Sequence, residues 1–326
     1  MSMPANEYAF FDLQPERGAD LDELLAGFRL ADKKVSPKFF YDEAGSKLFD
    51  EITQLDEYYL TRTEMKLFDE YHREIVDALQ VGARESCLVE YGSGSSAKVR
   101  KLLDTLRPSA YMPVDISTEH LQAAARALHQ SYPWLHVYPT CADFTQPFEL
   151  PAVADGFVRT GFFPGSSVGN FEPEEAVTFL ANVSRTLGSG ARFLIGVDLK
   201  KDVDVLEAAY NDPDGVTARF NLNLLSHLNA RYGADFEVSA FEHRASYNEE
   251  LGCIQMFLIS LRAQTVTLSG EHFSFGAGER IHTENSYKYA PEEFSRLARQ
   301  SGFDLTRVWI DERGWFGVFL LEVRGG

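Results

Sequence analysis

A glycine-rich loop carries the clearest chemistry in this 326-residue chain. Residues 87–91 are apolar apart from Glu90, and Gly92-Ser93-Gly94 follows them directly. The next residues have helical spacing, with apolar side chains on one face at Val99, Leu102, Leu103 and Leu106. Glycines let a ligand approach the backbone closely, and the start of a helix offers unpaired N–H groups. The succession of strand, glycine turn and helix therefore predicts a nucleotide-binding crossover.

The loop by itself leaves two cofactors open. Gly92, Gly94 and Ala97 satisfy the Gly-x-Gly-x-x-Ala fingerprint of dinucleotide sites, which would suit a nicotinamide cofactor. S-adenosylmethionine is the other candidate, although this chain has Ser96 where the methyltransferase loop has a third glycine. Serine is tolerated at that position because it can cap the start of a helix.

Acidic residues near the ends of expected strands favour S-adenosylmethionine. Glu90 has the acidic position typical of methyltransferase loops, and a buried acid there needs a partner, such as the backbone amides of the loop. Asp115 ends the second strand, where its carboxylate can accept from both ribose hydroxyls. A dinucleotide enzyme uses the same device, so Asp115 indicates only a nucleoside. Asp143 follows the third strand and is placed to reach an adenine amino group, and Lys98 could pair with a methionyl carboxylate. The alternatives are helix caps or solvated loop positions for the acids and a solvated helix surface for Lys98.

Strand and helix patterns alternate through the first part of the chain and resume at its end. The expected strands cover residues 87–91, 111–114, 135–138, 156–163, 191–197, 305–310 and 315–323. This alternation predicts a parallel sheet with helices on both faces. The short turn at 311–314 makes the last strand antiparallel, which again favours S-adenosylmethionine over a nicotinamide. Residues 200–286 break the alternation and are expected to form a lid or second lobe together with the first sixty residues.

Composition excludes several classes of function. The formal net charge is −18, and a field of that sign opposes contact with phosphate backbones and anionic lipid. We therefore expect no nucleic-acid and no membrane partner. Three cysteines without a Cys-x-x-Cys pair argue for a reducing compartment, and eight histidines without His-x-x-x-His spacing give a metal centre little support. The first eighteen residues lack the pattern of a signal peptide, so a cytoplasmic protein is expected.

Five segments in a fixed order carry a family resemblance. They are YDEAGSKLFDEITQLDEYYLTRTE (41–64), YGSGSSAK (91–98), FFPGSSVGNF (162–171), AAYNDPDGVTARFNLNLL (208–225) and HTENSYKY (282–289). Together they resemble the histidine-specific Nα-methyltransferases of ergothioneine biosynthesis. The match runs from about Tyr41 to the last strand and so covers most of the chain.

The resemblance implies an α/β fold and an activity. It implies a Rossmann-type (class I) methyltransferase sheet with an antiparallel last strand, formed by residues 61–199 and 288–326. A second α+β substrate-binding lobe, residues 1–60 and 200–287, interrupts this domain. The implied reaction uses S-adenosyl-L-methionine to convert L-histidine through mono- and dimethylhistidine to trimethylhistidine (hergynine), with S-adenosyl-L-homocysteine as product and no metal. The expected enzyme is a monomer that acts on a small-molecule amino acid.

Site residues follow from the same resemblance. Tyr58 would face the substrate amine, and Asn170 and Tyr210 would hold the carboxylate and amine end; Tyr58 and Asn170 are the candidate catalytic residues. Glu284 and Ser286 would hydrogen-bond the imidazole nitrogens. The pocket would be completed by Tyr41, Phe49, Gly165 and Thr217. The cofactor would contact Gly92, Gly94, Lys98, Asp115, Asp143 and Phe144.

The residue types suit these roles. Glu284 and Ser286 are two apart, so on an extended segment they project to the same side and could grip one ring. Asn285 and Tyr287 interleave with them where smaller or apolar neighbours would be expected. Tyr58 and Phe49 would suit cationic groups through cation–π contact, although core packing is the alternative role for aromatic residues. Two other functions stay open: an N-methyltransferase for an indole or other aromatic amino acid, and a non-catalytic S-adenosylmethionine-binding regulator.

Overall fold

The computed structural model describes residues 7–13, 17–79, 85–94 and 97–325. Its contacts divide the chain into two compact units. Unit 1 comprises residues 1–14, 60–200 and 288–326, and unit 2 comprises residues 15–59 and 201–287. Each unit contains separate stretches of the sequence. Residues 201–287, which belong to unit 2, interrupt unit 1 between residues 200 and 288.

A largely parallel sheet forms the centre of unit 1. Its strands run in the order β1-β6-β4-β3-β7-β8-β15-β14, with β5 paired to β4. They are β1 (Phe11–Asp12), β3 (Ser86–Tyr91), β4 (Ala110–Asp115), β5 (His136–Val137), β6 (Thr140–Cys141), β7 (Val158–Phe163), β8 (Arg192–Asp198), β14 (Phe303–Ile310) and β15 (Phe316–Val323). Among these described strands only β15 runs opposite to all the others; it pairs antiparallel with both β8 and β14. The expected α/β class with an antiparallel last strand is confirmed.

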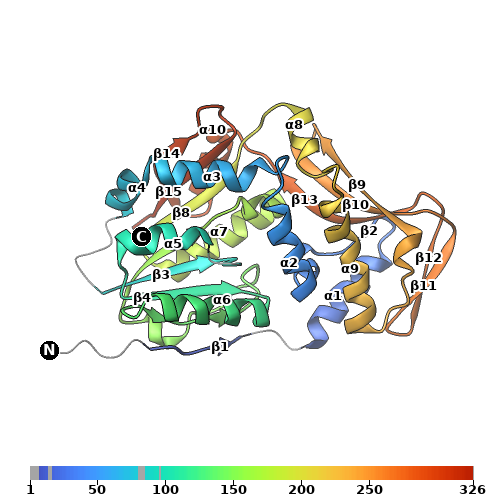
Figure 1. Ribbon diagram of the computed structural model, residues 1–326, viewed down its shortest axis with the longest axis horizontal. Helices are drawn as coiled ribbons and strands as arrows, with labels where there is room; N and C mark the ends of the chain where they lie inside the picture. Colours follow the sequence, from blue (N-terminus) through green and yellow to red (C-terminus); the bar gives the residue numbers. More distant parts are fainter. Residues whose placement is uncertain (1–6, 14–16, 80–84, 95–96, 326) are drawn as a thin grey trace. The chain divides into compact units, whose positions relative to one another are not determined.

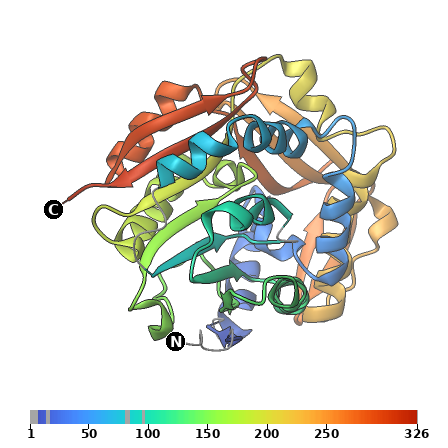
Figure 2. The same ribbon diagram turned by 60° about the vertical axis from the view of Figure 1, so that its left-hand side comes forward.

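Helices cover both faces of this sheet. They are α3 (Tyr59–Glu70), α4 (His72–Leu79), α5 (Ala97–Leu106), α6 (Thr118–Ser131), α7 (Pro173–Leu187) and α10 (Pro291–Gln300), with short 3₁₀ turns η2 (Ala152–Ala154) and η3 (Ser167–Asn170). The pair α4 and α5 packs together on one face, and α7 packs with α10 on the other (Figures 1 and 2). Both α7 and α10 begin at proline, whose fixed φ and missing N–H are tolerated in a first turn.

The N-terminal segment belongs to unit 1. Phe11 and Asp12 pair in parallel with Thr140 and Cys141, and the N–H of Phe11 donates to the carbonyl of Pro139 at 2.9 Å. The sequence had placed residues 1–60 together in the substrate lobe. The pairing differs from that expectation because the exposed edge of β6 offers backbone partners that a sequence pattern does not reveal. A role of unit 2 in substrate binding stays a prediction.

Unit 2 has a mainly antiparallel sheet covered by helices, in which only the short β2 among the described strands pairs in parallel, with β13. The main sheet has the order β2-β13-β10-β9, and β11 pairs with β12. The strands are β2 (Lys33–Lys34), β9 (Phe241–Asn248), β10 (Cys253–Ser260), β11 (Gln264–Leu268), β12 (Glu271–Phe275) and β13 (Arg280–Tyr287); the helices are α1 (Arg17–Arg29), η1 (Pro37–Phe40), α2 (Glu43–Ile52), α8 (Val203–Ala208), α9 (Val216–Tyr232) and η4 (Val238–Ala240). Helix α9 packs on β9 and β10 and also contacts α2 and η1, so it links the sheet to the N-terminal residues of the unit (Figure 1).

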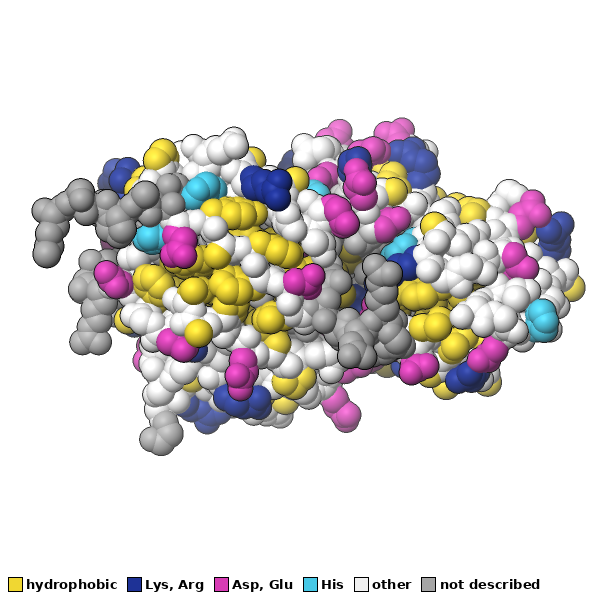
Figure 3. Space-filling view, turned by 90° about the horizontal axis from the view of Figure 1, so that it is seen from below, with side chains coloured by type: hydrophobic (Ala, Val, Ile, Leu, Met, Phe, Trp, Pro, Cys, Tyr) yellow, Lys and Arg dark blue, Asp and Glu magenta, His cyan; other side chains and the backbone are white. Residues whose placement is uncertain are grey.

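The surface agrees with the composition. Figure 3 shows Asp and Glu side chains dispersed over one face and interspersed with Lys and Arg, without one large acidic patch. Within the described residues, no helix has the length and apolar character needed to cross a membrane.

Candidate active site

The glycine loop follows β3 and is fixed by the end of β4. The N–H of Gly92 donates to the carbonyl of Val114 at 2.8 Å, and the N–H of Gly94 donates to Asp115 Oδ2 at 3.1 Å. Gly92 and Gly94 have φ of 62° and 47°, in the left-handed region that favours glycine. A Cβ at Gly94 would meet no atom within 4 Å, so a ligand can approach the backbone there. Ser96, the departure from a third glycine, lies outside the described residues.

Asp115 can still accept further hydrogen bonds. Its Oδ1 accepts from the N–H of Ser117 at 3.0 Å, while Oδ2 holds Gly94. Burial raises the pKa of Asp115 above its usual range, although these N–H groups oppose that shift. Each carboxylate oxygen has two lone pairs, so capacity remains for the hydroxyls of a ribose. This fits the expected role of Asp115 at the carboxyl end of a parallel strand.

Glu90 has a different partner from the expected one. Its buried side chain accepts a hydrogen bond from the hydroxyl of Tyr111 on the neighbouring strand. Burial raises the pKa of Glu90 to about 8, even though the Tyr111 hydroxyl stabilises the charged form. The sequence suggested loop amides as partners, but in the structure the N–H groups of Gly92 and Gly94 donate instead to the Val114 carbonyl and to Asp115.

Lys98 forms an ion pair that sequence reasoning missed. Its ammonium lies 2.6 Å from Oε2 of Glu64, whose side chain has no solvent exposure. The N–H of Gly165 donates to both carboxylate oxygens of Glu64 at 3.0 Å. An ammonium has three protons, so this pair is compatible with a further carboxylate on Lys98. Glu64 is the last residue of the family-like segment 41–64, and its place in that segment is the sequence signal that could have identified it.

Asp143 and Phe144 are held beside the loop. Asp143 is buried, and its Oδ1 accepts from the N–H and the hydroxyl of Thr145 at 3.0 and 2.5 Å. The ring of Phe144 lies edge-on to Phe163, with 5.7 Å between centroids. A Cβ on Gly92 would come within 3.5 Å of that ring. The structure thus brings Gly92 and Phe144 together, as expected for one side of a nucleoside site.

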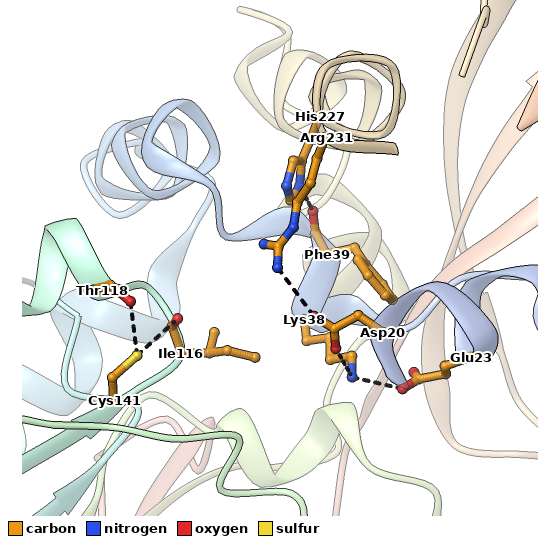
Figure 4. A network of polar contacts seen from close by, with 9 residues as sticks. All are labelled: Asp20, Glu23, Lys38, Phe39, Ile116, Thr118, Cys141, His227 and Arg231. Carbon is orange, nitrogen blue, oxygen red and sulfur yellow. Dashed lines mark hydrogen bonds and ion pairs between the residues drawn. The ribbon is translucent and has the colours of Figure 1, made fainter. Parts of the chain in front are cut away.

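The cysteines are structural. Figure 4 shows Cys141 Sγ near the hydroxyl of Thr118 at 3.1 Å and the carbonyl of Ile116 at 3.5 Å, all within unit 1. Cys87, Cys141 and Cys253 are all buried, and none of these described cysteines forms a disulfide. Burial raises the pKa of Cys87 to about 12, so its thiol is not nucleophilic at neutral pH. The described part of the chain contains no group of three or more His, Cys, Asp or Glu suited to a metal ion.

Asn170 ends a strained turn after β7. Gly165 and Ser166 have φ of 85° and 61°, and the hydroxyl of Ser166 accepts from the N–H of Asp198 at 2.8 Å. The N–H of Gly169 donates to the carbonyl of Ser166 at 2.8 Å. These bonds fix the turn that places half-buried Asn170 beyond the carboxyl end of a parallel strand.

Aromatic rings gather in unit 2. Tyr41, Phe49, Tyr58 and Tyr210 form a continuous series of edge-on contacts with centroids 6.0, 6.3 and 6.2 Å apart. Phe220 on α9 was not expected in this group, yet its ring lies 6.0 Å from both Tyr41 and Phe49. The structure therefore brings together four predicted pocket residues and adds a fifth.

Strand β13 presents the predicted imidazole pair. Glu284 and Ser286 are buried, with 7% and 4% exposure, and lie opposite Met256 and Ile254 of β10. The hydroxyls of Ser286 and Tyr210 share a hydrogen bond of 2.8 Å. The pair therefore adjoins the end of the aromatic series at Tyr210.

The residues that interleave with this pair turn the other way. Asn285 Oδ1 accepts from Gln255 Nε2 at 3.1 Å and from His282 Nε2 at 2.8 Å. A β-bulge at Thr283 allows the latter bond, because Glu284 pairs with Met256 while His282 pairs with Phe257. Alternation along the strand thus keeps the amide of Asn285 away from Glu284 and Ser286.

A histidine supports the backbone of Tyr210. Asn221 donates through Nδ2 to the carbonyl of Phe257 at 3.1 Å and lies 2.8 Å from His243 Nδ1. The carbonyl can only accept, so Nδ2 faces both groups and His243 Nδ1 must accept as well. Its Nε2–H then donates to the carbonyl of Tyr210 at 2.9 Å. Burial lowers the pKa of His243, which favours this neutral tautomer.

Asp212 fixes the start of α9. Its carboxylate accepts from the N–H of Val216 at 2.7 Å and of Thr217 at 2.8 Å. Burial by itself would raise the pKa of Asp212, but these bonds outweigh it and lower the pKa. Thr217, a predicted pocket residue, is buried at this helix start.

A polar network holds the N-terminal residues of unit 2. Lys38 pairs with Asp20 at 3.0 Å and Glu23 at 2.7 Å, and Arg231 reaches Asp20 at 3.3 Å (Figure 4). His227 Nδ1 lies 2.7 Å from the carbonyl of Phe39. The segment before Tyr41 is therefore anchored to α1 and α9.

Comparison with known proteins agrees with this arrangement. The family model described as "Histidine-specific methyltransferase, SAM-dependent" matches residues 20–323. Histidine N-alpha-methyltransferase of Mycolicibacterium smegmatis is 38% identical over 305 residues, covering 91% of this chain and 93% of the relative. The protein of the same name from Mycobacterium tuberculosis is 37% identical over 304 residues, with the same coverage. Ergothioneine biosynthesis protein 1 of Schizosaccharomyces pombe is 28% identical over 278 residues, or 81% of this chain and 36% of the relative.

The matched range includes nearly all described residues of both units and every candidate site residue. The family match and the two bacterial relatives span the sheet, its loops and the inserted residues alike. The chain belongs to the histidine-specific, S-adenosylmethionine-dependent methyltransferase family.

Proposed function

We propose that this protein transfers methyl groups from S-adenosyl-L-methionine to the α-amine of L-histidine. The products would be mono-, di- and finally trimethylhistidine (hergynine), and the reaction would be the first step of ergothioneine biosynthesis. The observation that carries the proposal is the buried pair Glu284 and Ser286 beside the aromatic series that ends at Tyr210. The names of the two bacterial relatives and of the Schizosaccharomyces pombe relative support it.

The proposed specificity comes from the imidazole ring. A carboxylate accepts a hydrogen bond from one ring N–H, and a serine hydroxyl can donate to the other ring nitrogen. Glu284 and Ser286 supply these two groups from one face of β13. An amino acid without ring nitrogens would leave them unsatisfied, at a cost of about 1–3 kcal/mol for each buried group.

The aromatic residues suit the amine end. Tyr58 is proposed to face the α-amine, and Asn170 to contact the amino acid through an amide that can both donate and accept. The rings of Phe49 and Tyr58 can stabilise a cationic amine through cation–π contact. An α-amine is largely protonated at neutral pH, so a proton must leave before each transfer.

The cofactor residues are proposed as a second set. S-adenosylmethionine, when bound, supplies an electrophilic methyl group. Asp115 would bind the ribose hydroxyls, Asp143 and Phe144 the adenine, and Lys98 the methionyl carboxylate. The open approach at Gly94 and the remaining acceptor capacity of Asp115 support this assignment.

We further propose a cytoplasmic monomer. Three buried cysteines that form no disulfide suit a reducing compartment.

Mass spectrometry of a reaction with S-adenosylmethionine and an equimolar mixture of the twenty amino acids tests the proposal. We expect the mass of histidine to increase by that of one, two and then three methyl groups. Methylation of another amino acid with histidine untouched would keep the cofactor and refute the imidazole assignment. Binding of the cofactor without any methylated product would favour the non-catalytic regulator.

A further inference from the structure

Glu64 on α3 is a buried carboxylate for which the proposed reaction gives no role. Its side chain has no solvent exposure, and it receives Lys98 on Oε2 and the N–H of Gly165 on both oxygens. Lys98 lies in the first turn of the helix after the glycine loop, whereas Gly165 begins the turn that ends at Asn170. One carboxylate therefore joins two segments assigned to different ligands.

The neighbouring strand leaves room for Glu64 because it has a glycine, Gly196, beside the carboxylate. Gly196 lies in β8 with an ordinary φ, and a Cβ added there would fall on Glu64 Oε1, well inside contact distance. The backbone would accept alanine at this position, but the carboxylate would have to move. The role of Gly196 is therefore to leave space for Glu64, since its backbone does not form a turn.

We propose that Glu64 is a positioning residue that couples the cofactor loop to the Asn170 turn. It directs the Lys98 ammonium and holds the Gly165 amide, so displacement of the carboxylate should weaken binding of both ligands. The amino-acid part of this inference rests on the proposed function, whereas the cofactor part rests on the family to which the chain belongs.

Charge decides the choice of residue. A buried carboxylate balances the Lys98 charge and accepts from Gly165 at the same time. The amide of glutamine has one acceptor oxygen and presents N–H groups toward an ammonium or an amide N–H. Aspartate retains the charge but is shorter by one methylene group. Glutamine should therefore be more harmful than aspartate.

The first experiment compares Glu64→Gln and Glu64→Asp with Glu70→Gln, an exposed residue of the same helix. Calorimetry of S-adenosylhomocysteine binding to the cofactor-free enzyme gives one constant, and the KM for histidine at saturating S-adenosylmethionine gives the other. We expect Glu64→Gln to weaken both by about tenfold or more, as for loss of a charge-assisted hydrogen bond. Glu64→Asp should recover part of both losses, and Glu70→Gln should leave both constants unchanged.

The second experiment moves the carboxylate without altering it. Gly196→Ala should reproduce the loss in both constants. Gly161→Ala in the neighbouring strand is the matched control, because its Cβ would meet the apolar side chains of Phe193 and Leu187. We expect Gly161→Ala to lower the melting temperature while both constants stay near the native values. This comparison applies even where Glu64→Gln fails to fold.

Three results would overturn the inference. Glu64→Gln or Gly196→Ala could lower only the melting temperature and leave both constants unchanged. Either could change one constant alone, or Glu64→Asp could be as impaired as Glu64→Gln. If the acceptor proves to be a different amino acid, the proposed function fails, but the same two constants measured with that acceptor still test Glu64.

Discussion

The hydroxyl of Tyr210 lies 2.8 Å from the hydroxyl of Ser286, although the two residues are separated by 76 positions in the sequence. Tyr210 is also the last ring of the aromatic series, and its carbonyl is held by His243. The contact therefore connects the aromatic residues to the polar pair on β13. It also restricts which way the Ser286 hydroxyl can point.

Removing the hydroxyl of Tyr210 should impair use of histidine. We expect Tyr210→Phe to raise the KM for histidine about tenfold, since a buried partner is left unsatisfied at a cost of about 1–3 kcal/mol. Binding of S-adenosylhomocysteine should be unchanged by calorimetry. Tyr247→Phe, on β9 of the same unit, serves as the control. An unchanged KM in Tyr210→Phe would show that the Ser286 contact is only structural.

Glu284→Ala should reduce histidine methylation more strongly, because a charged acceptor is removed from a buried position. Loss of a hydrogen bond to a charged group corresponds to roughly tenfold to a hundredfold in kcat/KM. Steady-state rates at fixed S-adenosylmethionine measure the effect, and Glu242→Ala, at an exposed position of β9, is the control. Histidine turnover at the native rate would refute the imidazole role.

Asp115→Ala should weaken cofactor binding and also disturb the loop. The variant loses acceptors for Gly94 and Ser117 as well as those proposed for a ribose. We expect at least a tenfold rise in the dissociation constant of S-adenosylhomocysteine. Asp115→Asn retains one acceptor oxygen, so its dissociation constant should lie between those of the native protein and Asp115→Ala. Equal affinity in all three proteins would exclude Asp115 from the nucleoside site.

The protonation of Glu90 should make stability depend on pH. Its folded-state pKa is raised to about 8, so the folded protein holds a proton that the unfolded chain releases near its ordinary pKa. This contribution is fully present below about pH 4.5 and is lost as the pH rises through 8. Glu90→Gln keeps a neutral side chain at every pH. Urea unfolding at pH 5, 7 and 9 should show the variant gaining stability relative to the native protein with rising pH, and a constant difference would contradict the shift.

The buried ion pair of Lys288 and Asp198 should be costly to break. Their charged atoms lie 2.9 Å apart, and neither side chain is exposed. Lys288→Met leaves an uncompensated buried carboxylate, so we expect a loss of about 3–5 kcal/mol in the free energy of unfolding. The double variant Lys288→Met/Asp198→Asn should recover part of it. Chemical denaturation measures both, and additive losses would show that the pair is not coupled.

Local pattern predicted much of unit 1. The expected first strand, 87–91, agrees with Ser86–Tyr91. Pro173 in a first turn and Gly188 just past the last turn predict a helix between them, which is α7 (Pro173–Leu187). In unit 2 the apolar spacing over residues 216–232 predicts a long helix, and the structure has α9 there (Val216–Tyr232). These elements have clear periodicity and end signals, which depend on neighbouring residues alone.

Contacts between distant segments were harder to predict. Nothing in the spacing of Glu64 indicates that it meets Lys98 and Gly165, because the fold rather than the chain brings them together. Strand β9 was missed since its residues alternate weakly, and its register is set by β10. The single strand expected at 135–138 is instead two short ones, β5 and β6, and β6 also receives the N-terminal segment. The site residues themselves were predicted only through the family resemblance.

The register of β13 against β10 determines how selectivity for the amino acid can change in evolution or by design. Substitutions at 284 and 286 alter the side chains opposite Met256 and Ile254 while the strand keeps its pairing. A shift of one residue in this strand would instead bring Asn285 and Tyr287 to that face. Point substitutions in β13 can therefore adapt the site to another amino acid. An insertion or deletion in this strand instead replaces all the side chains on that face in a single step.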